Sequence, residues 1–227
     1  MASGIRPFQP APAQLPTSLP VFPLPGALLL PGGRLPLNIF EPRYLAMVED
    51  AMAAGRMFGM IQPDIMRPEG ETGPALFTVG CLGRITSFAE TEDGRIVLSL
   101  LGLTRFTVEE ELPMRLGYRR LRVSYDSYRA DLAASFDGSP SLPRQELLEA
   151  LQGYFVGQGL NADWDAINAL EDEDLLTALC MMCPFAPSEK QALLEAESLS
   201  ARCDILLALL EFGLHGTDDE NGTPRLS

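Results

Sequence analysis

The stretch LPVFPLPGALLLPGGRLPLNIFEPRYLAMVEDAMAAG, residues 19–55, decides the first half of the fold. It opens with two short apolar runs, residues 19–24 and 35–40, which prolines and glycines interrupt. This texture predicts short strands at sheet edges, joined by turns at Pro25-Gly26 and around Gly32. Residues 41–55 then carry apolar side chains at three- and four-residue spacing, which predicts one helix.

The chain as far as residue 125 continues as strands. Asp93-Gly94 is a hairpin signal, and residues 119–125 alternate between apolar and polar side chains, as a half-buried strand does. We expect strands at 57–61, 76–88, 95–100, 103–108 and 119–125. Because only one helix lies among them, we predict a mainly antiparallel sheet or small barrel.

The second half has a helical period. Beyond Asp137-Gly138 we expect helices at 143–158, 163–170, 172–183, 188–195 and 199–214. The predicted fold class is α+β, a β-rich part with one helix followed by an α-helical bundle. We expect a flexible proline-rich arm at 1–18, the β-rich part at 19–130, the helical part at 131–215 and a disordered tail at 216–227.

The charge divides at the same place. The net charge is −14. Residues 1–130 hold 13 acidic and 13 basic side chains, whereas residues 131–215 hold 15 acidic and 3 basic ones. Such an acidic half repels nucleic acid and anionic lipid, so we expect neither as a partner. No apolar run suits a membrane helix or a secretory signal, and we expect a cytoplasmic protein.

The scarcity of lysine and histidine excludes most catalytic devices. Lys190 is the single lysine, and no phosphate-binding GxxxxGK[ST] loop contains it. Its acidic neighbours predict a solvated surface lysine with a raised pKa, unsuited to a Ser–Lys dyad. His215 is the single histidine, at the edge of the predicted tail, so a Ser-His-Asp set is not expected. We therefore predict a non-catalytic protein without a cofactor.

Three cysteines of the helical half allow one alternative. Cys180, Cys183 and Cys203, together with His215, could supply four ligands to a structural zinc ion. Leu176 and Leu179 share the face of the Cys180–Cys183 pair, and this favours core packing over metal or redox chemistry.

Two features indicate binding. Arg119, Arg120 and Arg122 lie among tyrosines, a pattern that leaves RNA binding open as a second alternative. The methionines and phenylalanines between Phe40 and Met66 form an adaptable apolar cluster, which favours core packing or a groove for extended peptide.

Several motifs resemble one family. The segments LPVFPL at 19–24, LPGGRLPL at 30–37 and IFEPRY at 39–44, followed by Met47-Val48, are similar to the N-terminal domain of Lon proteases. The segments VGCLGRI at 79–85, GLTRF at 102–106 and PSEKQALL at 187–194 extend the resemblance over about residues 19–212. It implies a pseudo-barrel similar to PUA-like folds, then a helical bundle, in a domain that recognises unfolded or tagged substrates ahead of ATPase and protease domains.

The resulting hypothesis is a stand-alone substrate-binding module of Lon type. It would bind unfolded or hydrophobic protein segments, or a partner protease or chaperone, in a groove between the two halves. The candidate contact residues are Phe22, Phe40, Tyr44, Met47 and Phe58. The other positions that match the family motifs are expected to hold the fold; they are Glu41, Arg43, Gly102, Arg105 and Phe106.

Overall fold

A computed structural model describes residues 10, 12–132 and 142–215 of this chain. Most of the arm predicted at 1–18, namely residues 1–9 and 11, and the tail predicted at 216–227 lie outside the described residues. The chain forms two compact units, residues 1–136 and 137–227. Each unit is described by itself.

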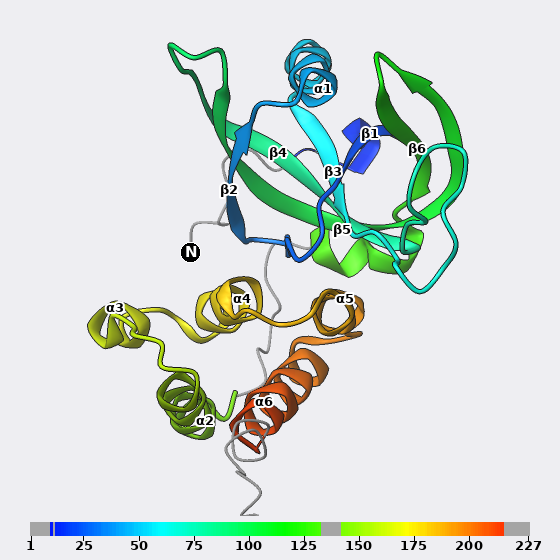
Figure 1. The fold of residues 1–227 in the computed structure, drawn as a ribbon. Coiled ribbons are helices and arrows are strands. Elements are labelled where there is room, and N and C mark those ends of the chain that lie inside the picture. The colour runs from blue at the N-terminus through cyan, green and yellow to red at the C-terminus, as the bar shows by residue number, and fades with distance from the viewer. Residues whose placement is uncertain (1–9, 11, 133–141, 216–227) are drawn as a thin grey trace, which may run out of the picture. The chain divides into compact units, whose positions relative to one another are not determined.

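The first unit is the β-rich one (Figure 1). Its elements, in chain order, are the 3-10 turn η1 (Pro12–Gln14), β1 (Ser18–Pro23), β2 (Arg34–Ile39), α1 (Pro42–Ala53), β3 (Met57–Ile61), β4 (Val79–Glu90), β5 (Ile96–Arg115), β6 (Tyr118–Ser124) and the 3-10 segment η2 (Asp126–Leu132). Pro42 stands in the first turn of α1, where its missing N–H is not needed.

The six strands form one sheet that closes on itself. Their order is β2-β5-β4-β3-β1-β6, and β5 also pairs with β6. Five strands therefore complete a ring, while β2 pairs with the first part of β5. All pairings are antiparallel except β1 with β3, which run parallel. The prediction of a mainly antiparallel barrel is confirmed, and α1 is the helix inserted among the described strands.

Strand β5 differs from its prediction. The sequence indicated two separate strands, 95–100 and 103–108. The structure has a single strand of 20 residues that runs through Gly102 to Arg115. A Cβ atom at Gly102 would lie 2.0 Å from the carbonyl oxygen of Leu30, so glycine is present to admit a neighbouring backbone. The length of β5 lets its two ends pair with different strands.

The barrel core is built around Phe106. Its ring is fully buried and lies where Cβ atoms at Gly59 and Gly80 would come within 2.9 and 2.4 Å of it. Leu19, Leu82 and other residues of the strands complete this cluster. Helix α1 is tied to the β5–β6 hairpin, because the Tyr118 hydroxyl donates to the Asp50 carboxylate over 2.6 Å.

The second unit is helical. It contains α2 (Arg144–Gly157), α3 (Trp164–Asn168), α4 (Asp172–Met182), α5 (Pro187–Glu195) and α6 (Leu199–His215). All five helices were expected, with bounds that differ by two residues or fewer. Leu175, Leu176 and Leu179 lie on the buried face of α4, as their spacing predicts. None of the helices in the described part of the chain is long and apolar enough to span a membrane.

The lysine and the two arginines between residues 142 and 215, where the structure describes the helical unit, share one role: each binds one of the last carbonyl groups of a helix. The Lys190 Nζ donates to the Met181 oxygen of α4 over 3.2 Å, and the Arg202 Nε donates to the Leu193 oxygen of α5 over 2.9 Å. Arg144 reaches the Asn168 oxygen at the end of α3 over 3.0 Å. Cations at these positions also neutralise the negative ends of the helix dipoles.

Lys190 therefore departs from its prediction as a solvated side chain with a raised pKa. It is 6% exposed, and burial lowers the pKa of its amine while the nearby Cys183 opposes that change. The acidic neighbours along the sequence misled the prediction, because the lysine points inward to the end of α4 and away from them.

Candidate protein-binding sites

The five residues predicted to contact a partner occupy different environments. Phe58 and Met47 are fully buried, and Phe22 and Tyr44 are each 7% exposed. These four side chains fill the interior between α1 and the strands, so a partner does not reach them in this conformation. Phe40 is the accessible member of the set, at 61% exposed.

Phe40 projects from the junction of β2 and α1. Its ring lies 5.8 Å from the guanidinium carbon of Arg95, which extends from the turn between β4 and β5. Arg95 in turn pairs with Asp93 of the same turn, over 2.8 Å. A large aromatic ring is thus held at the surface beside a hairpin tip, an arrangement that suits contact with another chain.

The neighbouring motif residues hold this junction together. The Arg43 Nη2 donates to the Glu41 carboxylate over 2.8 Å, and the Arg43 guanidinium lies 4.6 Å from the Tyr44 ring centroid. The Tyr44 ring packs on Phe22 with centroids 4.3 Å apart. Burial raises the pKa of the Tyr44 hydroxyl, and the positive charge of Arg43 acts in the opposite direction. This group has the contacts of a structural cluster.

The later motif residues are also engaged in the fold. Gly102 admits the backbone at Leu30, and Phe106 fills the barrel core. The Arg105 guanidinium forms two bonds to Asp131, of 2.9 and 2.8 Å, and stacks 4.3 Å from the Tyr128 ring centroid. These contacts join the middle of β5 to η2.

The cysteines lie in apolar surroundings. All four are buried free thiols. Burial raises the pKa of Cys180 to about 12 and that of Cys183 to about 11, and it raises that of Cys203 as well. Among the described residues no cluster of cysteine, histidine, aspartate or glutamate has a metal-binding arrangement; the His215 side chain lies outside the description. Nothing in this geometry supports the zinc alternative.

The arginines of the RNA alternative already have partners. Arg119 is buried and forms paired bonds of 2.7 Å to the Glu111 carboxylate. Arg122 pairs with Glu110 over 3.2 Å, and Arg120 donates to the Ser18 hydroxyl over 3.2 Å. With two of the three neutralised by acids, this strand gives no support to a phosphate-binding surface.

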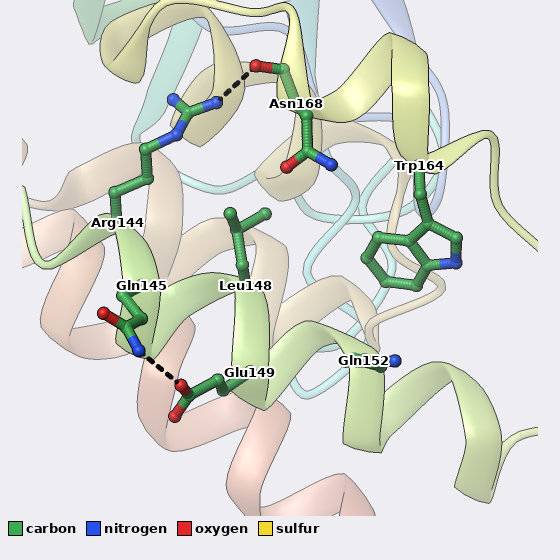
Figure 2. A pocket seen from close by; sticks show the side chains of 7 residues that line it. All are labelled: Arg144, Gln145, Leu148, Glu149, Gln152, Trp164 and Asn168. Atoms are coloured by element: carbon green, nitrogen blue, oxygen red, sulfur yellow. Dashed lines mark hydrogen bonds between the residues drawn. The ribbon is translucent and has the colours of Figure 1, made fainter.

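Two pockets in the helical unit were missed by sequence reasoning. The first, of about 540 Å³, lies between α2 and α3 (Figure 2). Figure 2 shows hydrogen bonds between lining residues: Arg144 donates to the Asn168 carbonyl, and Gln145 donates to Glu149 over 2.9 Å. Trp164 and Leu148 supply its apolar surface. The single tryptophan was the signal available in the sequence.

The second pocket is larger and more apolar. It has a volume of about 570 Å³ and lies between the end of α2, the loop after it, α3 and α4. Its aliphatic lining is formed by Leu160, Ile167, Leu170, Leu175, Leu179 and Met182. Met182 is 82% exposed and Leu160 is 40% exposed, so the apolar surface reaches the mouth of the pocket. We refer to this site as the α3–α4 pocket.

Comparison with known proteins identifies the family. Residues 18–211 match the model of the ATP-dependent protease La (LON) substrate-binding domain. This protein belongs to that family. The match spans both units, so membership of the Lon substrate-binding family supports a substrate-recognition module.

Known Lon proteins resemble the chain in sequence and structure. Lon protease 2 of Myxococcus xanthus is 27% identical over 204 residues, which is 86% of this chain and 24% of the relative. The crystal structure of a Lon N-terminal domain protein from Xanthomonas campestris superposes with a TM-score of 0.56 at 28% identity, covering 85% of this chain and 98% of the other. The N-terminal domain of Lon from the Mycobacterium avium complex also gives a TM-score of 0.56, at 16% identity, covering 86% of this chain and 98% of the other. The last likeness concerns the fold alone.

The M. xanthus protease is much longer than this chain, whereas the two solved domains have nearly the same extent. This chain spans about a quarter of the length of the curated Lon protease from M. xanthus, but it covers nearly all of the two solved N-terminal domains. The shared region is therefore the Lon substrate-binding domain, and the motifs around Phe40 and Gly102 belong to it.

Proposed function

We propose that this Lon-family domain binds exposed apolar segments of incompletely folded polypeptides and performs no chemistry on them. The match of residues 18–211 to a substrate-binding domain is the observation that carries the proposal. A protease or chaperone that displays such a segment would be recognised by the same contacts.

The accessible apolar side chains support this proposal. Phe40 stands at the surface beside Arg95, and the α3–α4 pocket presents aliphatic side chains at its mouth. Apolar side chains gathered at a surface are typical of sites that bind other chains. Phe40 replaces the wider set of five as the proposed contact residue of the β-rich unit.

The surroundings of Lys190 support the absence of catalysis. Its Nζ atom donates to a backbone carbonyl in the helical unit and is engaged in holding α4. We also propose a cytoplasmic location, and the free state of the four cysteines agrees with a reducing compartment.

The proposal is tested with permanently unfolded proteins. Lysozyme and α-lactalbumin, each reduced, capped with carbamidomethyl groups and labelled with a fluorophore, are titrated with this protein while anisotropy is recorded. We expect at least one unfolded protein to bind and both native forms to remain free. If neither unfolded protein binds, the proposal is overturned.

A matched pair of variants locates the contact. Phe40→Ser should weaken binding of the unfolded protein severalfold, whereas Phe212→Ser, which removes an even more exposed phenylalanine from α6, should leave it unchanged. Equal effects of the two variants would remove Phe40 from the contact surface.

A further inference from the structure

The α3–α4 pocket has the size and lining of a ligand site. Its volume of about 570 Å³ falls within the roughly 300–1,000 Å³ of known ligand pockets. Its wall is aliphatic over α3, α4 and the loop between them, and Cys183, which also lines it, is buried. Such a wall favours an apolar side chain over a polar or charged group.

The charge around this pocket is strongly negative. Residues 142–215 hold 13 acidic and 3 basic side chains, a net charge of −10. The three cations are committed to helix ends: Lys190 and Arg202 are buried, and Arg144 is held by Asn168 and Asp172. The acidic side chains of this unit therefore face solvent with little compensation from cations.

One acidic residue lines the pocket, and a second lies beside a lining residue of α4. Asp163 lines it and accepts from the Ala166 amide over 3.0 Å at the start of α3. Asp174 lies one helical turn before Ala178, a lining residue of α4, and so shares its face. Both carboxylates belong to exposed residues. An apolar cavity with an acidic rim favours an occupant that combines an apolar side chain with neighbouring cations.

We infer that the α3–α4 pocket binds an apolar side chain of a polypeptide segment whose flanking residues are lysine or arginine. This inference rests on the proposed function and names the class of segment that the helical unit selects. A second copy of this chain is disfavoured as the occupant, because its net charge of −14 would meet a surface of the same sign.

Three peptides test the inference. They share one leucine-containing centre and carry lysine, serine or glutamate on both sides, and their binding to the full chain is measured by anisotropy. We expect the order lysine, serine, glutamate from tightest to weakest, and a lysine advantage that decreases as salt is added. Serine and lysine peptides of equal affinity would overturn the inference.

Charge variants with a matched control locate the site. The double substitution Asp163→Ser with Asp174→Asn removes two rim charges, and serine retains the ability to cap α3. Glu197→Gln with Asp204→Asn changes the net charge equally at exposed positions outside the pocket. We expect the first pair to weaken the lysine peptide by roughly threefold to tenfold and the second to have a much smaller effect. Equal losses would indicate non-specific attraction and overturn the inference.

Apolar variants complete the test. Leu160→Ser with Met182→Ser should weaken the lysine peptide at least about tenfold, whereas Val156→Ser with Phe212→Ser should not, although both pairs remove exposed apolar side chains. Thermal unfolding checks that each variant is folded. If the neutral dye Nile red binds in the pocket while no peptide does, the pocket serves a small apolar molecule and the inference fails.

Failure of this inference can be distinguished from failure of the proposed function. Binding of unfolded lysozyme and α-lactalbumin without any dependence on peptide charge or on the pocket variants keeps the proposed function and overturns the inference. Binding of the lysine peptide through the pocket, without binding of either unfolded protein, keeps the pocket assignment and overturns the proposed function.

Discussion

Arg105 and Asp131 form a buried ion pair in the β-rich unit, with 2.8 Å between Nη2 and Oδ1 and both side chains less than 8% exposed. The Arg105 amide also donates to the Asp131 carboxylate, over 2.9 Å. Burial opposes the charged form of Arg105, but the hydrogen bonds and the charge of Asp131 outweigh it and raise the pKa of the guanidinium. Since η2 ends at Leu132, this pair fixes the last described segment of the unit to the barrel.

Breaking this pair should destabilise the protein strongly. Arg105→Met leaves the Asp131 carboxylate buried without its main partner, and we expect a loss of about 3–5 kcal/mol in the free energy of unfolding, measured by urea denaturation. The double variant Arg105→Met with Asp131→Asn should lose less than the sum of the two single variants, because the second change removes the uncompensated charge. Additive losses would contradict the pairing.

The Glu111–Arg119 pair predicts a dependence of stability on acid. The bonds from Arg119 lower the pKa of Glu111, against the effect of burial. A carboxylate with a lowered folded-state pKa stabilises the protein above its unfolded pKa, and this contribution is lost as the pH falls through the lowered value. The advantage of the wild type over Glu111→Gln in urea denaturation should therefore be largest near neutral pH and disappear in strong acid.

An advantage that persists unchanged in strong acid would show that Glu111 acts through packing. Glu109→Gln is the control for this measurement, because Glu109 is exposed and should show a small difference at either pH.

The local signals of the sequence account for most of the helices and strands. Pro42 and Asp163 are residue types typical of helix starts and stand at the starts of α1 and α3, and the three-to-four spacing of Leu175, Leu176 and Leu179 gave the buried face of α4. These are properties of neighbouring residues, so one sequence is sufficient to read them.

The features that the sequence did not reveal depend on distant residues. Two strands were expected on either side of Gly102, whereas this glycine lies within one strand and admits Leu30, a residue 72 positions earlier in the chain. Lys190 was expected in solvent, because nothing near it in the sequence shows that the end of α4 lies within its reach. The α3–α4 pocket is formed by three helices and a loop, and its lining has no single motif. Four of the five residues predicted to contact a partner are large hydrophobic or aromatic residues that are buried in the core.

The thiols should be unreactive in the native state. The four cysteines are buried, and burial raises the pKa of Cys180 and Cys183 well above that of a free thiol. Because the thiolate is the reactive form, a disulfide reagent at mildly alkaline pH should modify few thiols in the folded protein and all four in denaturant.

The same apolar environment of the cysteines predicts that chelators do not change the stability of the protein. Removal of metal with EDTA should leave the melting temperature unchanged, because the thiols pack as small apolar groups. A stoichiometric zinc content, with a fall in melting temperature after EDTA, would reverse this conclusion and revive the set of Cys180, Cys183, Cys203 and His215.

A substitution in the turn between β5 and β6 should stabilise the protein. Leu116 has a φ of 49° and is followed by Gly117 at 83°, a backbone that suits Asn-Gly and costs leucine roughly 1–2 kcal/mol. We expect Leu116→Asn to raise the free energy of unfolding by about 1 kcal/mol, seen as a higher melting temperature. Gly117→Ala is the control and should lower the free energy of unfolding. Alanine there would have to adopt a positive φ, and its Cβ would lie 3.3 Å from the Cβ of Arg43.

The strained position at the β5–β6 turn carries an exposed apolar side chain. Leu116 is 66% exposed at the hairpin tip, close to Met114 at 49%, so the strain holds an apolar group in solvent. If this tip contacts polypeptide segments, Leu116→Asn will be more stable than the wild type and yet bind unfolded protein more weakly. If Leu116→Asn is more stable and binds equally well, the tip is not part of the contact surface. If Leu116→Asn is less stable than the wild type, the positive φ of Leu116 does not cost the fold stability.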